Sequence, residues 1–220
     1  YTAKLPAELP RKIGFTEVDL EDPEACGERE CNIGNLITDS FVSHFEPIRV
    51  NQSLVSDCDN TLALVNSGNI RSSISEGSIA FKHILSVLPF NNHLGIIRLN
   101  GSDLVRVFQH SASQHRNGGF LQVSGFRVSY NQTRPSNGAE PKLVLDKLEV
   151  NCGNGWQAIS PNATYLVVSN NYVAKGGDGY KMIRRENYTS YKISDSKIVA
   201  KHIERMQNAT TLVEDRILIR

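Results

Sequence analysis

The sequence predicts an α+β domain in which helices flank a mixed β-sheet. Short apolar runs bounded by turn residues, such as residues 62–65 and 165–169, are typical of buried strands. Apolar residues between Cys31 and Phe45 recur at the three- and four-residue spacing of an amphipathic helix. Helical and strand-like segments are interleaved, but they do not alternate strictly as in a doubly wound parallel sheet.

The other expected elements follow from the same patterns. Ser102 is expected to cap a helix that starts there, because apolar residues at helical spacing follow it. Further helices are expected over residues 81–88 and 197–206, and further strands over 12–20, 94–99, 120–130, 143–150 and 216–220. Asp22, Pro23 and Glu24 are expected to break the chain after the first strand.

A single domain over residues 1–220 is expected, since no repeat, low-complexity run or internal linker is visible. The chain starts at Tyr1 without an initiating Met or a signal-like apolar segment, which indicates a mature form or an excised fragment. Residues 1–11 are therefore expected to be the remnant of a linker from an upstream segment.

Composition excludes several classes of protein. Hydrophobic residues make up 40% of the 220 residues, which is too many for a disordered chain. The 24 Lys and Arg residues nearly balance the 23 Asp and Glu residues, so we expect no nucleic-acid partner. No apolar stretch approaches the roughly 20 residues that span a bilayer, so no transmembrane segment is expected.

Cysteines and sequons indicate secretion. The 4 cysteines are compatible with two disulfides and equally with free thiols. Asn-x-Ser/Thr sequons are frequent, and each marks a candidate glycosylation site in a secreted protein. They begin at Asn51, Asn131, Asn162, Asn187 and Asn208. The even cysteine count and these sequons together predict an extracellular protein.

Motifs for independent catalysis are absent. The 6 histidines show no helical zinc spacing, and there is no nucleophile elbow, P-loop or dinucleotide fingerprint. His110 is the most suggestive single residue, but a lone His among apolar neighbours is more often a hydrogen-bonded core residue. The chain alone is therefore not expected to be a hydrolase.

Two turns that follow buried strands carry the best candidates for ligand binding. Asn66 and Arg71 lie at the first, and a guanidinium is suited to phosphate or carboxylate. Asp178 lies in the glycine-rich second turn, where it could accept hydrogen bonds from ligand hydroxyls. Phe90 and Tyr172 could stack on a flat ring, although each alone is more typical of a core.

With the exception of Tyr172, these residues lie in segments that follow the order seen in 5′-nucleotidases. The matching segments are residues 30–36, 66–71, 87–90, 120–125 and 175–180. From about Lys12 onward the chain resembles the C-terminal, substrate-binding domain of the ecto-5′-nucleotidase, apyrase and UDP-sugar hydrolase family. The Gly-Gly-Asp-Gly-aromatic loop is the most specific match.

The resemblance implies a role for each candidate. Phe90 and Tyr172 correspond to two aromatics that enclose a purine base, and Asp178 to the carboxylate that binds the ribose hydroxyls. Asn66 and Arg71 correspond to a polar pair near the ribose and phosphate. The resemblance also implies a Cys26–Cys31 disulfide, and elimination then leaves Cys58 to pair with Cys152.

In that family a separate N-terminal domain holds two divalent metals and a catalytic His-Asp pair. The resemblance therefore implies no catalytic residue, no metal and no cofactor in this chain. Gly27 stands where vertebrate relatives have an arginine, and Ser67 and Asn69 replace glycines of the family turn. These departures put tight phosphate binding in doubt and leave nucleoside binding intact.

Three functions stay open. The chain is either the purine-binding part of a secreted nucleotidase or apyrase, or a secreted non-catalytic protein that acts on a host partner. The second class resembles salivary proteins of blood-feeding insects, and the two departures in the pocket lean toward it. A structural remnant without a ligand is the third.

Overall fold

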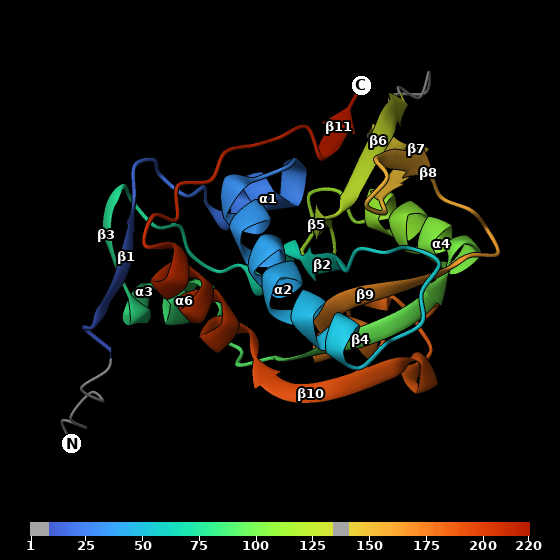
Figure 1. The fold of residues 1–220 in the computed structure, drawn as a ribbon. Helices are drawn as coiled ribbons and strands as arrows, with labels where there is room; N and C mark the ends of the chain where they lie inside the picture. The colour runs from blue at the N-terminus through green and yellow to red at the C-terminus, as the bar shows by residue number, and fades with distance from the viewer. Residues whose placement is uncertain (1–8, 134–140) are drawn as a thin grey trace.

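A computed structural model describes residues 9–133 and 141–220. Most of the expected linker remnant lies outside these residues, although the backbone carbonyls of Leu9 and Arg11 accept hydrogen bonds from Lys82 and Phe81. Figure 1 shows helices packed around a twisted central sheet, with a smaller sheet beside it. The expected α+β fold with a mixed sheet is therefore confirmed.

The central sheet has 5 strands in the order β10-β4-β9-β2-β5. Neighbouring β2 and β9 are parallel, whereas the other pairs are antiparallel. The strands are β2 (Leu62–Asn66), β4 (His93–Asn100), β5 (Leu121–Ser124), β9 (Thr164–Asn170) and β10 (Tyr188–Ser194). Every residue of β2 is buried, because both faces of the sheet are covered.

A second sheet has 4 strands in the order β11-β6-β7-β8, and a two-stranded sheet pairs β1 with β3. In the second sheet β11 runs parallel to β6, next to the C-terminus at the top of Figure 1. These strands are β1 (Lys12–Thr16), β3 (Gly77–Ala80), β6 (Phe126–Thr133), β7 (Lys142–Asn151), β8 (Trp156–Ala158) and β11 (Ile217–Ile219).

Helices cover the central sheet on opposite faces. The longest helix, α2, packs with α6 on one face, and α4 packs with the second sheet on the other. The α-helices are α1 (Pro23–Glu28), α2 (Asn32–Asn51), α3 (Phe81–Val87), α4 (Gly101–Ser113), α5 (Asn171–Ala174) and α6 (Asp195–Met206). The 3₁₀ turns in the described part of the chain are η1 (Ser67–Asn69), η2 (Gly177–Gly179) and η3 (Arg185–Asn187).

Some local predictions were wrong. Asn100, not Ser102, caps α4, since its side-chain oxygen accepts from the amide of Asp103 at 2.7 Å. The expected strand 120–130 is split at Gly125, whose φ of +78° turns the chain from the central sheet into the second. Asp22 does more than end a strand, because its carboxylate caps α1.

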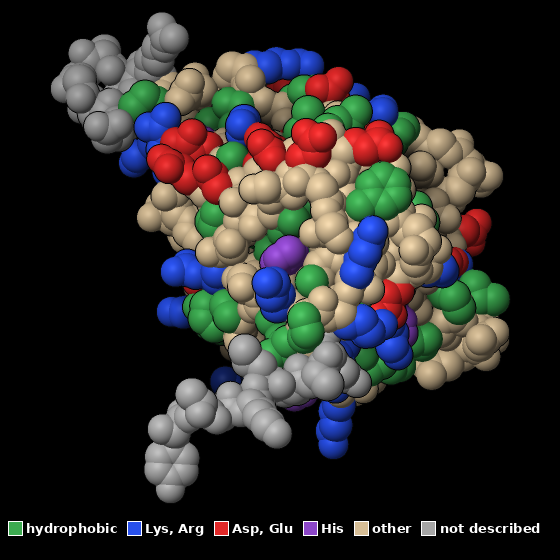
Figure 2. Space-filling model, turned by 90° about the vertical axis from the view of Figure 1, so that its left-hand side faces the viewer, with side chains coloured by type: hydrophobic (Ala, Val, Ile, Leu, Met, Phe, Trp, Pro, Cys, Tyr) green, Lys and Arg blue, Asp and Glu red, His purple; other side chains and the backbone are tan. Residues whose placement is uncertain are grey.

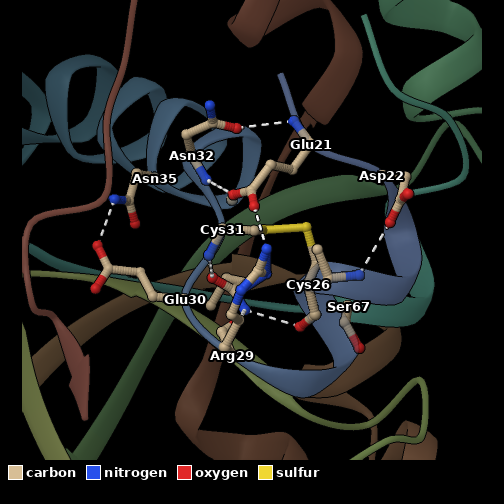
Figure 3. The surroundings of a disulfide bond; sticks show 12 residues. Glu21, Asp22, Cys26, Arg29, Glu30, Cys31, Asn32, Asn35 and Ser67 are labelled. Atoms are coloured by element: carbon tan, nitrogen blue, oxygen red, sulfur yellow. Dashed lines mark hydrogen bonds and ion pairs between the residues drawn. A yellow bond between two sulfur atoms is a disulfide. The ribbon is translucent and has the colours of Figure 1, made fainter. Parts of the chain in front are cut away.

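A disulfide joins the end of α1 to the start of α2 (Figure 3). Its loop is held by Gln122 of β5, whose amide donates to the carbonyls of Cys26 and Arg29 and accepts from the amide of Cys31. Glu30 of the same loop is buried and accepts from Asn35. These contacts fasten α1 beside η1, at the edge where β2 ends.

Figure 2 shows the side of the molecule that carries β1, β3 and α3. A row of Asp and Glu side chains crosses the upper part of this face, and Lys and Arg side chains lie above and below it. Charges of both signs are therefore mixed on this surface, which agrees with the near-neutral composition.

Candidate functional site

Two neighbouring strands end in asparagines that contact each other. Asn66 ends β2 and Asn170 ends β9, and both side chains are buried. The amide of Asn170 donates to Oδ1 of Asn66 at 3.1 Å, and Nδ2 of Asn66 donates to Oδ2 of Asp178 at 2.8 Å. Because β2 and β9 are parallel, their last residues lie at the same edge of the sheet. The hydrogen bonds therefore run from Asn170 through Asn66 to Asp178.

Asp178 lies in a tight turn that its surroundings hold in place. Its φ of 51° is in the left-handed region, which non-glycine residues adopt mainly at functional sites and turns. The hydroxyl of Tyr172 donates to Oδ1 of Asp178 at 2.7 Å, and Nε2 of His110 lies 2.8 Å from the carbonyl oxygen of Asp178. His110 thus helps to hold the turn in place, which agrees with the expectation that its side chain is hydrogen-bonded.

The hydrogen bond to Asp178 changes the pKa of the Tyr172 hydroxyl. Hydrogen bonding to the Asp178 carboxylate is the largest of the effects that raise the pKa of Tyr172. A phenol is already protonated at neutral pH, and the raised pKa keeps this hydroxyl a donor further into the alkaline range. Each carboxylate oxygen of Asp178 accepts one hydrogen bond from the protein and has a second lone pair for a ligand hydroxyl.

A cavity of about 330 Å³ opens beside this carboxylate. Two large aromatic side chains line it while remaining accessible, Phe90 at 57% exposure and Tyr172 at 45%. The lining residues are Asn66, Gly68, Asn69, Phe90, Asn92, Tyr172 and Asp178. The exposed aromatic rings can stack on a flat ring of a ligand, and the carboxylate in the same cavity can accept hydrogen bonds from hydroxyl groups of that ligand.

Arg71 lies in a neighbouring cavity of about 340 Å³, which shares Gly68 with the first. Its guanidinium carbon is 6.0 Å from the centre of the Phe90 ring. Gly68 permits a close backbone approach, since its amide donates to the carbonyl of Gly118 at 2.7 Å and a Cβ there would lie 3.0 Å from that oxygen.

The second cavity has charges of both signs. Arg116 lines it together with Gly27, whose carbonyl accepts from the Arg116 amide at 2.8 Å. The Arg116 side chain pairs with Glu28 at 3.2 Å, and Glu24 also lines the cavity. Two guanidiniums are thus offset by two carboxylates, which weakens the attraction for an anion.

The structure brings four of the five predicted ligand-binding residues to one cavity, namely Asn66, Phe90, Tyr172 and Asp178. It places Arg71 next to them. Asn92 was missed, although it follows Phe90 by two residues in a polar turn. Asn69 was noted only as a departure from the family turn, yet it lines the cavity.

The cysteines and sequons lie as follows. Cys26 pairs with Cys31, and Cys58 pairs with Cys152, which matches the expected pairing. Three of the candidate glycosylation asparagines are exposed and two are half-buried. The exposed ones are Asn51, Asn131 and Asn162, and the half-buried ones are Asn187 and Asn208.

Neither a metal centre nor a membrane-spanning helix is found in residues 9–133 and 141–220. Within them, no group of three or more His, Cys, Asp or Glu side chains is placed to hold a metal ion. No helix in the described part of the chain combines the length and apolar character needed to cross a membrane.

Comparison with known proteins assigns the family. The model for "5'-nucleotidase, C-terminal domain" matches residues 12–185. The chain belongs to the 5′-nucleotidase family and corresponds to its C-terminal domain. The family resemblance expected from the sequence is therefore confirmed.

Relatives in this family are longer than the chain. It is 34% identical to the 5'-nucleotidase of Diplobatis ommata over 94% of the chain and 36% of that protein. It is 33% identical to the 5'-nucleotidase of Homo sapiens over 99% of the chain and 38% of that protein. The chain thus spans somewhat over a third of the length of these 5′-nucleotidases.

Solved structures support the same domain. A 5'-nucleotidase precursor from Thermus thermophilus superposes with a TM-score of 0.82 at 30% identity, over 97% of the chain and 40% of that structure. The NAD nucleotidase of Haemophilus influenzae, at 22% identity and a TM-score of 0.74, shares the fold over 97% of the chain and 38% of its own.

Proposed function

We propose that this C-terminal domain of the 5′-nucleotidase family binds a purine nucleoside or nucleotide. The base would stack between Phe90 and Tyr172, and Asp178 would accept hydrogen bonds from the ribose hydroxyls. The observation that carries the proposal is the carboxylate of Asp178, held by Asn66 and Tyr172 at the wall of a cavity with two exposed aromatics.

A phosphate on such a ligand would face the neighbouring cavity of Arg71 and Arg116. The nearby Glu24 and Glu28 offset these guanidiniums, and Gly27 adds no charge. We therefore expect the phosphate to add little to the affinity, so that adenosine and AMP bind with similar strength.

Hydrolysis is assigned to a separate catalytic domain with two divalent metals, as the family resemblance implies. The longer relatives are named 5'-nucleotidases, and this chain covers somewhat over a third of them. We propose that the chain by itself turns over neither AMP nor ATP. Two disulfides support a secreted protein. A salivary origin and a host protein partner remain predictions.

Calorimetric titration of adenosine and AMP into the purified chain tests the binding site. Asp178→Asn keeps the shape and the tolerance for a positive φ but removes the charge, and we expect it to weaken both ligands about tenfold. Asp146→Asn removes an exposed carboxylate from β7 of the other sheet and serves as the control. Absence of binding, or equal binding by both variants, would overturn the proposal.

A further inference from the structure

Three polar side chains from separate segments form one hydrogen-bonded chain that ends at the cavity. Asp195 begins α6 and is fully buried. Its Oδ2 accepts from Nδ2 of Asn69, at 3.1 Å, and Oδ1 of Asn69 accepts from Nδ2 of Asn92, at 2.8 Å. Asn69 is buried, whereas Asn92 is half-buried and lines the cavity together with Phe90 and Tyr172.

The direction of this chain is set at its buried end. An ionised carboxylate only accepts hydrogen bonds, so Asn69 must turn its NH₂ group to Asp195. The carbonyl oxygen of Asn69 then faces Asn92, and Asn92 must donate to it from its own NH₂ group. Oδ1 of Asn92 is consequently left as an acceptor for the ligand, and no described residue donates to it.

Other contacts hold the two ends in place. The second oxygen of the Asp195 carboxylate accepts from the amide of Ser196 at 2.7 Å. The backbone amide of Asp195 donates to the carbonyl of Asn92 at 2.9 Å, which ties the Asn92 turn to the start of α6. Neither the carboxylate nor the turn is free to reorient independently.

We propose that Asp195 is a positioning residue that, through Asn69, fixes the amide of Asn92 with its oxygen toward the base. The pocket then prefers purine nucleosides with a 6-amino group to those with a 6-oxo group. This inference rests on the proposed function, because it takes the base to lie between Phe90 and Tyr172.

The preference follows from matching donors to acceptors. In adenine the 6-amino group donates, and it can meet Oδ1 of Asn92 directly. In hypoxanthine a carbonyl oxygen occupies the same position, so two acceptors face each other. Asn92 cannot flip to offer its NH₂ group to a 6-oxo substituent without breaking its bond to Asn69. A 6-oxo base loses this single hydrogen bond and leaves Oδ1 of Asn92 unpaired, which weakens binding by about tenfold.

The experiment compares adenosine with inosine by calorimetry at pH 7.5 in four proteins. These are the unaltered chain, Asp195→Asn, Asn92→Ala and the control Asp146→Asn. An Asn at position 195 offers both a donor and an acceptor, so it satisfies Asn69 in either orientation and no longer sets the direction. Asn92→Ala removes the proposed contact with the base directly. Since Asn92 is only half-buried, this variant still tests the inference if Asp195→Asn fails to fold.

We expect the unaltered chain and Asp146→Asn to bind adenosine about tenfold more tightly than inosine. In Asp195→Asn and Asn92→Ala this ratio should fall to less than about threefold. A merely structural role for Asp195 would weaken both ligands equally and keep the ratio, which would overturn the inference. Equal binding of the two ligands by the unaltered chain would also overturn it but leave the proposed function standing. Failure to bind either ligand would overturn both.

Discussion

The hydroxyl of Tyr172 donates a hydrogen bond to Oδ1 of Asp178 over 2.7 Å, although Tyr172 also presents its ring to the cavity. One side chain thus both offers a stacking surface and holds the carboxylate beside it. The amide of Asp178 also donates to the same hydroxyl, at 3.3 Å. Both contacts stabilise the left-handed turn at Asp178 before any ligand arrives.

Separate substitutions should resolve these two roles of Tyr172. Tyr172→Phe keeps the ring and loses the hydroxyl, so adenosine affinity should fall about fivefold, the value of one hydrogen bond. Tyr172→Ala also loses the stacking surface and should weaken binding about tenfold to a hundredfold. Calorimetry of both variants provides the measurement. If Tyr172→Phe and Tyr172→Ala bind adenosine equally weakly, the ring of Tyr172 does not stack on the ligand.

Gly177 packs directly under the Tyr172 ring. A Cβ at position 177 would lie 2.6 Å from two ring carbons of Tyr172, so Gly177→Ala must displace the ring. We expect adenosine affinity to fall about tenfold, because the aromatic pair is no longer aligned. Gly27→Ala is the matched control, since a Cβ there meets only Ser67 Oγ at 3.9 Å. Unchanged binding in Gly177→Ala would show that the ring position is unimportant.

Gly27 has room for a larger side chain at the cavity of Arg71 and Arg116. Gly27→Arg should add a cation there and strengthen AMP binding about fivefold, with adenosine binding nearly unchanged. The measurement is the AMP-to-adenosine affinity ratio at low ionic strength, and the gain should shrink as salt is added. A gain that is the same for both ligands would mean that the phosphate does not reach this cavity.

Burial raises the pKa of Asp195 from 3.8 to about 6, against the lowering effects of Asn69, Ser196 and His93. A carboxyl group with a raised pKa binds its proton more tightly in the folded protein. Its contribution to stability is therefore fully present below pH 3.8 and is lost as the pH rises through about 6.

Relative to Asp195→Asn, the free energy of unfolding should accordingly fall by up to about 3 kcal/mol between pH 4 and 7.5. Urea unfolding of both proteins at several pH values measures this difference. Because other groups titrate in both proteins, only the difference between the two curves is informative. If the free energy of unfolding of the unaltered chain, minus that of Asp195→Asn, rises with pH, burial does not destabilise the charged form of Asp195.

Local patterns predicted much of the fold because they act within one segment. The apolar run of β2 and the helical periodicity of α2 are both found where the patterns place them, since burial on one or both faces dictates such residues. The cap of α4 and the break at Gly125 were placed wrongly or missed. Several nearby residues could serve as a cap, and only the observed geometry selects Asn100.

In the candidate site, too, some residues could be predicted from local sequence patterns and others could not. Asn66, Phe90, Tyr172 and Asp178 were found because they follow buried strands or lie in segments that resemble a known family. Asp195 gave no signal, because an Asp at the start of a helix is ordinary in sequence. Its burial and its bond to Asn69 follow from the packing of α6 against the end of the sheet.

By itself, the sequence determined the fold class, the family and most of the residues that line the cavity, and the family resemblance implied the disulfide pairs. Only the tertiary structure decided that Arg71 lies in a separate cavity, and that Asp195, Asn69 and Asn92 form one directed chain. The reason is physical. Periodicity and turn residues encode local burial, whereas a hydrogen bond between residues 69 and 195 exists only after the sheet and its helices have packed.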